Sequence, residues 1–362
     1  MRIRRTTLLA ITIFIVSVLV CIGGYFLIQS ISDTKYHNVQ STQQGNEEAQ
    51  KNKEQLDRIQ EYIQTEFPGI VVWGDSLVQR GVADKLENQV NKKVISPLND
   101  KLEINTSSGI ELPVINMGVG SESSAMIAAR SGAIPYVVLN DFTVPSDTSK
   151  VDISVGLQDG STPQIKFGRS GSGLESVTIN DIEGIIETDY NQHYTFRRLT
   201  RGEEEKIIVG TQIYSVGSQL YRHYLPVIYI GTNGGYNDDP NELVLQQQAM
   251  VDYIDEPDNE FIIVGIHTGN KEKRSELEAV MRESWGDHYI NLREELVKFD
   301  YEGSGYELDE NDYSKIQAGE CPSCILESDG LHFNADGYKL VAQIIFNRMM
   351  QLGYFDSLNA IN

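Results

Sequence analysis

Cysteine and basic residues are both in short supply in this sequence. Three cysteines are spread over 362 residues, and the close pair Cys321 and Cys324 has no second pair of ligands, so a zinc knuckle is excluded. Lysine and arginine number 30 against 52 aspartates and glutamates, which gives a formal net charge of −22. A surface with that balance repels phosphate backbones, and we therefore expect no nucleic acid partner.

The N-terminus has the opposite character. Three arginines stand among its first five residues, and Leu8–Ile28 then runs without a charge for 21 residues, long enough to cross a bilayer. Arginines before this stretch and few positive charges after it orient the N-terminus to the cytoplasm and the rest to the outside. We expect residues 1–30 to be a cytoplasmic tip and a single-pass anchor in the cell membrane.

Two other interpretations of this segment are weaker. A cleaved signal peptide would have a shorter apolar region, and no small-x-small cleavage site precedes Gln29. A lipoprotein modified at Cys21 would need a small residue where the chain has Val20.

Residues 31–65 are polar and predict a stalk that becomes helical towards its end. Short apolar runs and helical patterns then alternate, which predicts a parallel sheet covered on both faces over residues 66–133 and 226–362. The expected strands are Ile70–Trp73, Pro113–Asn116, Pro226–Ile230, Phe261–Ile266 and His288–Asn291, and the clearest helices are Asp84–Val90, Glu242–Ile254, Lys271–Glu283 and a last one between Asn334 and Gly353.

Residues 134–225 break this pattern. They contain no convincing helix, and glycine-containing turns such as Asp159–Gly160 and Arg201–Gly202 separate alternating apolar runs. The runs are Tyr136–Phe142, Val151–Leu157, Ser176–Ile179 and Lys206–Tyr214. Because this pattern is typical of β-hairpins, we expect an all-β domain inserted between the second and third strands of the sheet.

A serine stands at the exit of the first predicted strand. Gly74, Asp75 and Ser76 follow Trp73 directly, and open α/β sheets bind ligands at the carboxyl ends of their strands. Ser76 can be a nucleophile there, or else Asp75 or Ser76 simply caps the next helix. A serine nucleophile needs a base, usually histidine, and the base needs an orienting group.

Among six histidines, His332 has a setting suited to that base. Asp329 lies three residues before it, close enough to accept a hydrogen bond from Nδ1 and leave Nε2 for a serine. The alternative is that Asp329–Gly330 is only a turn and His332 only flanks the next helix. The other five histidines have no special local setting, so we expect surface or packing roles for them.

Two more segments leave predicted strands at the same edge. The third strand ends in Gly231, Thr232 and Asn233, and an asparagine amide there can donate to a developing oxyanion. The second strand ends in a turn through Gly118 and Gly120, which can point a backbone N–H at the same place or can simply be flexible.

In this order, the segments Gly74–Ser76, Gly118–Gly120, Gly231–Asn233 and Asp329–His332 resemble the SGNH hydrolases, also called the GDSL esterase/lipase superfamily. The resemblance covers about residues 69–352 apart from the β insertion. It implies a five-stranded flavodoxin-like sheet in a three-layer α/β/α domain, with no metal or organic cofactor. The G-x-S-x-G elbow of classical α/β-hydrolases is absent, which agrees with this resemblance.

The resemblance also implies roles for single residues. Ser76 would be the nucleophile, His332 the general base and Asp329 its orienter. The oxyanion hole would use the Ser76 N–H, the Asn233 side chain and a backbone N–H of the glycine turn.

The third oxyanion donor departs from the family pattern. The position usually held by a glycine falls on Ser121, directly after Gly120. A backbone donor tolerates serine if its φ and ψ are ordinary, so the hole can survive the exchange.

Cys321 and Cys324 lie just before Asp329. In a domain outside the cell we expect them to form a disulfide that tightens the catalytic loop. The alternative is two unpaired thiols.

Together these features predict a membrane-anchored extracytoplasmic serine esterase that removes acetyl or other short acyl groups from a carbohydrate. Segments 231–238 and 118–124 are polar and glycine-rich, without large apolar residues for a long acyl chain. Alternatives are a lipase, thioesterase or O-acyltransferase on the same triad, or a surface carbohydrate-binding protein with a vestigial site. Aromatic rings of the insertion can lie against sugars or form its own core: Tyr190, Tyr194, Phe196, Tyr214, Tyr221 and Tyr224.

Overall fold

The computed structural model describes residues 47–102, 109–168, 172–189, 193–255 and 260–360. The expected membrane anchor and the first part of the stalk lie outside the described residues. Within the described ranges, no helix is both long and apolar enough to span a bilayer. The chain divides into two compact units, Met1–Arg58 and Ile59–Asn362. Residues 47–58 of the first unit are helical, and the second unit begins with helical residues 59–65.

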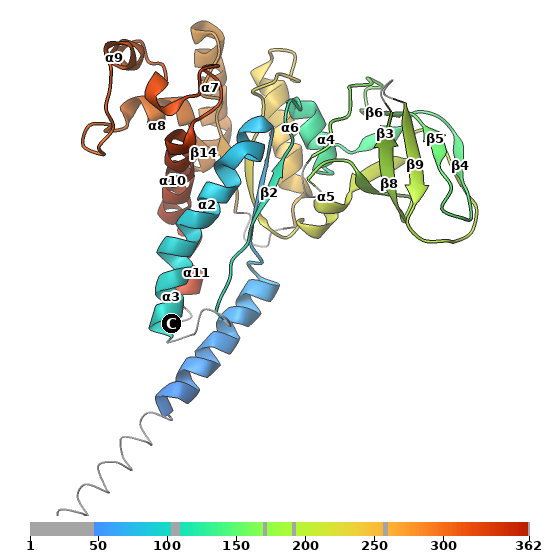
Figure 1. Cartoon of the computed structure of the whole chain (residues 1–362), viewed down its shortest axis with the longest axis horizontal. Coiled ribbons are helices and arrows are strands. Elements are labelled where there is room, and N and C mark those ends of the chain that lie inside the picture. The colour runs from blue at the N-terminus through green and yellow to red at the C-terminus, as the bar shows by residue number, and fades with distance from the viewer. Residues whose placement is uncertain (1–46, 103–108, 169–171, 190–192, 256–259, 361–362) are drawn as a thin grey trace, which may run out of the picture. The chain divides into compact units, whose positions relative to one another are not determined.

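A five-stranded parallel sheet forms the centre of the second unit (Figure 1). Its strands are β1 (Ile70–Gly74), β2 (Val114–Gly118), β12 (Leu225–Tyr229), β13 (Ile262–Val264) and β14 (Tyr289–Ile290), in the order β14-β13-β12-β1-β2. All five expected strands are confirmed, because each is a buried apolar run too short to be a helix. Counted along the chain the order is 2-1-3-4-5, which is the expected flavodoxin-like arrangement.

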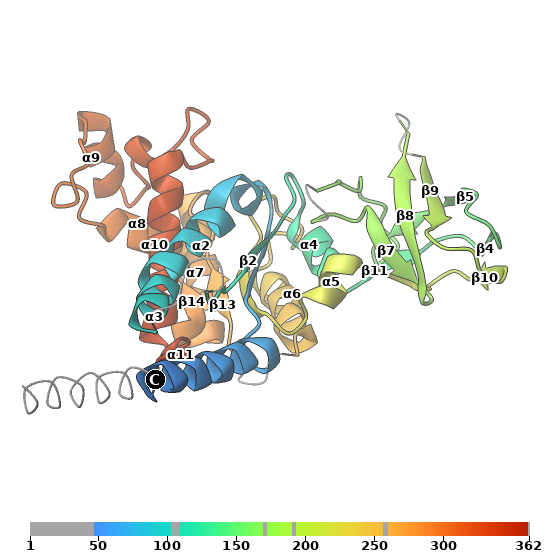
Figure 2. The ribbon, with the colours of Figure 1, turned by 60° about the horizontal axis from the view of Figure 1, so that its bottom comes forward.

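Helices cover both faces of this sheet. On one face, α4 (Ser124–Arg130), α6 (Pro240–Tyr253) and α7 (Lys271–Trp285) pack side by side over Val71 and Trp73 of β1. On the other face, α2 (Ala83–Val90) packs against α10 (Ala335–Gln351), and α10 against α8 (Leu292–Lys298), as Figures 1 and 2 show. The expected three layers are therefore present.

The ends of α10 are those that the sequence predicts. The Asn334 side chain accepts hydrogen bonds from the backbone N–H groups of Asp336 and Gly337, at 3.1 and 3.0 Å. Past the other end, Gly353 has φ +80°, a conformation that glycine adopts without steric cost. The remaining helical segments are η1 (Val78–Val82), η2 (Asn91–Ile95), α3 (Ser96–Lys101), α5 (Val216–Leu220), η3 (Gly286–His288), α9 (Glu310–Gln317), η4 (Ser323–Ile325) and α11 (Asp356–Ala360).

Antiparallel strands fill most of the stretch expected to be inserted (Figure 2). A seven-stranded sheet has the order β5-β9-β8-β7-β11-β3-β6, and β10 pairs with β4. The strands are β3 (Tyr136–Val138), β4 (Phe142–Val144), β5 (Val151–Ile153), β6 (Val155–Gly156), β7 (Ser176–Ile179), β8 (Ile182–Thr188), β9 (Tyr194–Arg198), β10 (Glu205–Ile207) and β11 (Gln212–Ser215). We call residues 136–215 the β subdomain.

Two features of this region differ from expectation. The sequence pattern does not predict β8 and β9, and it predicts no helix where α5 forms. The turn between β7 and β8 consists of Asn180 and Asp181 with φ +49° and +64°, so two residues tolerant of the left-handed region form this turn without a glycine. The helix α5 begins because the Ser215 side chain accepts from the Ser218 N–H at 3.0 Å.

Candidate active site

Ser76 lies at the carboxyl edge of the sheet, two residues after β1 ends. The strand order reverses between β1 and its neighbour β12, and such a reversal is where open α/β sheets form their ligand crevice. Gly74 makes the turn possible, because a Cβ there would lie 2.3 Å from Val78 Cγ2 and 2.7 Å from the Tyr229 carbonyl oxygen. The sharp exit thus depends on glycine and presents the next two side chains at the edge.

The structure brings Ser76 together with His332 and Asp329. His332 Nε2 lies 2.9 Å from Ser76 Oγ, and His332 Nδ1 lies 2.6 Å from Asp329 Oδ2. An ionised carboxylate only accepts, so Nδ1 carries the proton and Nε2 is left to accept from the serine hydroxyl. This is the donor order that an activated serine requires.

The Asp329 carboxylate is fixed from two sides. Its Oδ2 faces His332, while its Oδ1 accepts from the backbone N–H groups of Leu331 and His332 at 3.0 and 2.9 Å. The hydrogen bond to His332, followed by the two backbone donors, holds the pKa of Asp329 well below its usual range. Asp329 therefore stays ionised at any pH near neutrality.

His267 supports the loop that carries these residues, a role that the sequence pattern does not predict. The Leu331 carbonyl oxygen only accepts, so His267 Nε2 donates to it at 3.0 Å, and Nδ1 accepts from the Tyr229 hydroxyl at 2.9 Å. Burial lowers the pKa of His267 to about 4, which keeps the ring neutral. One feature of the sequence could have indicated this role, because His267 follows β13 at the same edge of the sheet.

Asp75 is buried beneath the nucleophile. Its Oδ1 accepts from the Leu77 N–H at 2.9 Å, and its backbone carbonyl accepts from the Gln79 N–H at 3.0 Å. Asp75 therefore caps the helix that follows β1. Ser76 next to it contacts His332 instead. Burial raises the pKa of Asp75 to about 6.

The Asn233 amide lies within reach of the same site. Its Nδ2 donates to the Glu122 carbonyl oxygen at 3.0 Å and to Asp75 Oδ2 at 3.3 Å. Both amide hydrogens therefore have acceptors in the protein, and the one on Asp75 is in the longer and weaker bond.

The glycine turn after β2 packs tightly against the segment after Ser76. A Cβ on Gly118 would lie 2.2 Å from the Gln79 nitrogen, and one on Gly120 would lie 2.9 Å from Gln79 Oε1 and 3.8 Å from Ser76 Cβ. Ser121 has φ +65°, so its backbone is not ordinary, contrary to the condition set above for a serine at this position.

A buried ion pair ties this turn to the rest of the molecule, and the sequence pattern did not identify it. Arg130 and Glu122 are 0% and 1% exposed, and their Nη2 and Oε2 atoms are 2.7 Å apart. Arg130 also donates to the carbonyl oxygens of Ser172, at 2.7 Å, and Gly74, at 3.3 Å. One guanidinium thus joins the turn, the strand before the nucleophile and the β subdomain.

The expected disulfide is not formed in this structure, in which Cys321 and Cys324 are free thiols, so their pairing stays a prediction. The Cys321 Sγ is buried and donates to the His267 carbonyl oxygen at 3.7 Å, while the Cys324 N–H donates to Asp312 Oδ1 at 3.0 Å. Burial raises the pKa of Cys321 to about 12, so the thiol stays protonated at neutral pH.

One group of side chains in the described residues has the spacing of metal ligands. Ligand atoms of Glu327, Asp329 and His332 lie within 4.8 Å of one another. Glu327 is paired with Arg80 at 2.8 Å, and the other two face each other through a proton. These contacts already engage one carboxylate oxygen of Glu327, one of Asp329 and one ring nitrogen of His332.

No family model matches the sequence, and no curated protein matches it. One solved structure that resembles the chain is described as "Peptidoglycan O-acetylesterase in action, 5 min". It has a TM-score of 0.32 and 12% sequence identity, and the match covers 82% of this chain and 95% of that chain. A likeness of that size decides nothing about the function of this chain.

Proposed function

We propose that this chain is a serine esterase that removes short acyl groups, acetyl above all, from a carbohydrate. The observation that carries the proposal is the line of contacts from Ser76 Oγ through the imidazole of His332 to Asp329. Serine, histidine and aspartate in this donor order activate a hydroxyl for attack on a carbonyl carbon.

The reaction divides into two acyl transfers. Ser76 Oγ attacks the ester carbonyl carbon and its proton moves to His332 Nε2, while Asp329 stabilises the imidazolium. The tetrahedral intermediate collapses, the C–O bond to the alcohol breaks, and the alcohol oxygen takes the proton from Nε2. Water then attacks the acyl-enzyme in the same way and releases the acid and free Ser76.

The oxyanion needs donors on the side opposite the imidazole. We assign the Ser76 N–H, a backbone N–H at Gly120 or Ser121, and the Asn233 amide to this role. Asn233 can serve by giving up its 3.3 Å bond to Asp75, the weaker of its two, while the bond to the Glu122 carbonyl keeps the side chain in place.

The choice of a short acyl group and a sugar rests on the lining of the site. Segments 231–238 and 118–124 contribute mostly polar side chains and glycines. Four of the rings that could bind sugar have packing roles. Phe196 is in the core of the β subdomain and Tyr194 packs against it, while Tyr221 and Tyr224 pack against the core of the α/β layers. Tyr190 lies outside the described residues.

The location of the enzyme is part of the proposal. The uncharged stretch Leu8–Ile28 after three arginines supports an anchor in the cell membrane, with the catalytic domain outside. There it would reach polysaccharides of the cell surface or the surroundings. An O-acyltransferase would use the same three residues with a sugar hydroxyl in place of water.

The first prediction tests the nucleophile and the base. We expect Ser76→Ala and His332→Ala each to remove nearly all hydrolysis of p-nitrophenyl acetate, because the two groups act as one unit. A fluorophosphonate probe should label the wild type at Ser76, located by peptide mass. The matched control is Ser96→Ala at the start of α3. Labelling at another serine would contradict the proposal.

The acyl and alcohol groups are tested with wild-type protein. We expect kcat/KM to be higher for p-nitrophenyl acetate than for the octanoate, and acetate to be released from acetylated xylan or O-acetylated peptidoglycan. A preference for octanoate without acetate release would indicate a lipase or thioesterase. Acetyl transfer to an added oligosaccharide in preference to water would indicate the acyltransferase.

A further inference from the structure

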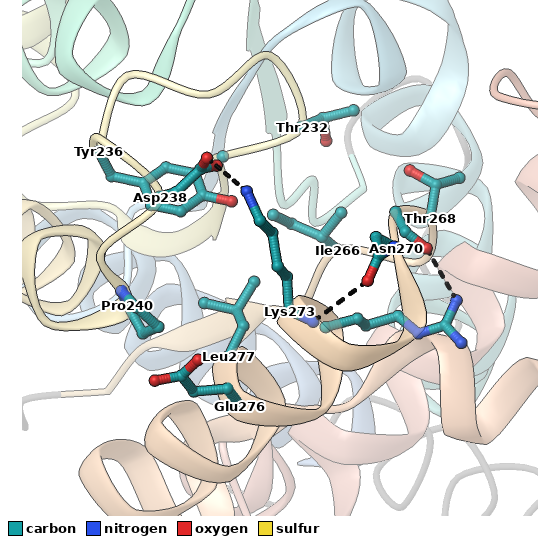
Figure 3. A pocket seen from close by; sticks show the side chains of 13 residues that line it. Thr232, Tyr236, Asp238, Pro240, Ile266, Thr268, Asn270, Lys273, Glu276 and Leu277 are labelled. Carbon is teal, nitrogen blue, oxygen red and sulfur yellow. Dashed lines mark hydrogen bonds and ion pairs between the residues drawn. The ribbon is translucent and has the colours of Figure 1, made fainter.

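A cavity opens beyond the carboxyl ends of β12 and β13, beside the first turns of α6 and α7, at the edge of the sheet where β1 ends in Ser76. Figure 3 shows the side chains that line it. Its volume is about 170 Å³. Pockets for drug-sized ligands measure about 300–1,000 Å³, so this one has room for a single small ring.

The cavity adjoins the proposed catalytic residues on two sides. Thr232 in its wall is the residue before Asn233, and Thr268 is the residue after His267, which holds the loop of His332. The cavity therefore lies beside the loops that carry Asn233 and His267, at the edge of the sheet where β1 ends in Ser76.

The wall of the cavity carries equal numbers of positive and negative side chains. Asp238 and Glu276 stand against Lys273 and Arg274, although the chain as a whole is strongly acidic. Lys273 Nζ and Asp238 Oδ2 form an ion pair 2.7 Å long between α7 and the loop before α6. A neutral ligand fits this balance better than an anion does.

The same ion pair has the properties of a recognition group. Its two side chains are 68% and 70% exposed, and ion pairs of that exposure stabilise a fold very little. The Tyr236 ring lies beside the pair, while Ile266 and Leu277 form an apolar floor (Figure 3). Donors, acceptors and apolar surface around a small space suit a ring with hydroxyl groups on its rim and C–H groups on its faces.

We propose that this cavity is a subsite for the sugar next to the acylated sugar. The enzyme then prefers glycan chains of two or more residues to single acetylated sugars. The proposal rests on the proposed esterase function, because it concerns the alcohol part of the same substrate.

The kinetic test compares substrates of different chain length, and it compares the wild type with one variant. We expect wild-type kcat/KM to be at least tenfold higher for O-acetylated xylobiose or O-acetylated N,N′-diacetylchitobiose than for the matching O-acetylated monosaccharide. In Lys273→Met the ratio of kcat/KM for the disaccharide to that for p-nitrophenyl acetate should fall about 2- to 10-fold, mainly through KM, as one or two hydrogen bonds are lost. The control Lys298→Met removes an equally exposed, ion-paired lysine on α8 and should leave the ratio at its wild-type value.

A binding measurement separates this proposal from the esterase itself. Calorimetric titration of Ser76→Ala with two neutral glycans free of O-acetyl groups, xylotetraose and N-acetylated chitotetraose, needs no catalysis. We expect one of them to bind and the binding to weaken in Ser76→Ala/Lys273→Met. Esterase activity without binding or chain-length preference would overturn the subsite. Binding that depends on Lys273, without any esterase activity, would overturn the esterase and keep the subsite.

Discussion

At the scale of single residues, the site is defined by where its protons are. His332 carries one on Nδ1 because Asp329 can only accept it, and His267 carries one on Nε2 because the Leu331 carbonyl can only accept it. The two imidazole rings thus carry their protons on opposite ring nitrogens. The first leaves a lone pair facing Ser76, and the second fixes the loop from beneath.

The oxyanion donors give a second prediction. Removing one side-chain donor costs about 10²–10³ in kcat, so we expect Asn233→Ala to lose that much with little change in Tm. Ser121→Gly should keep kcat within about twofold, because only its backbone N–H is assigned a role and glycine suits φ +65°. A large loss of kcat in Ser121→Gly would mean that its hydroxyl takes part.

A third prediction concerns the free energy of unfolding as a function of pH. Asp75 has a pKa of about 6 in the folded state against an ordinary 3.8, so between these values the folded protein holds a proton that the unfolded chain has lost. Stability from this group is therefore full below pH 4 and falls as pH rises to 6. Two pKa units correspond to about 3 kcal/mol.

Urea denaturation of wild type and Asp75→Asn tests this. The variant has no such loss, so its stability relative to wild type should rise by about 3 kcal/mol from pH 4 to pH 7. His267 has the opposing effect, because its lowered pKa costs stability as pH falls from 6.5 to 4. It is present in both proteins, so its effect cancels when the stability of the wild type is subtracted from that of the variant. A difference independent of pH would show that Asp75 titrates normally.

At the scale of elements, local patterns predicted the α/β layers and predicted the β subdomain only in part. Buried strands such as β1 are short apolar runs, and α10 has a capping Asn334 and a terminal Gly353, all of which are signals within a few residues. By contrast β8 and β9 have mixed sequences, and their pairing with β7 and β5 decides their structure. Such tertiary control is common in antiparallel sheets.

The same limit applies to the site. Ser76, Asn233 and His332 leave strands or precede a helix, so local patterns place them at one edge. The burial of Arg130 with Glu122 is set by contacts with Gly74 and Ser172, and no pattern among the neighbouring residues in the sequence predicts it.

A fourth prediction concerns that buried pair. Arg130→Met leaves the Glu122 carboxylate buried without its partner, and we expect a loss of about 3–5 kcal/mol in the free energy of unfolding. Adding Glu122→Gln should restore part of the loss, because no charge then remains. The control Arg282→Met breaks the exposed pair with Glu294 and should cost about 0–1 kcal/mol. A loss below 1 kcal/mol for Arg130→Met, measured by urea denaturation, would contradict the role of this residue.

At the scale of the whole molecule, net charge bears on the kind of ligand that can approach. A formal net charge of −22 surrounds the protein with a negative potential that repels polyanions and leaves neutral glycans unaffected. The side chains that line the subsite cavity carry as many positive as negative charges, so the cavity does not attract anions either. The sequence predicted the flavodoxin-like order through its motifs, whereas the membrane anchor stays a prediction.

The β subdomain leaves and rejoins the α/β layers at nearly one point, because the Ser215 hydroxyl donates to the Arg130 carbonyl oxygen at 2.9 Å. A segment whose ends lie together can be exchanged for a short linker without opening a gap in the α/β layers. Without the β subdomain, the Arg130 N–H that donates to the Ser172 carbonyl oxygen would face water, which can accept from it in place of Ser172. We therefore expect the α/β layers to tolerate exchange of the whole β subdomain for a short linker.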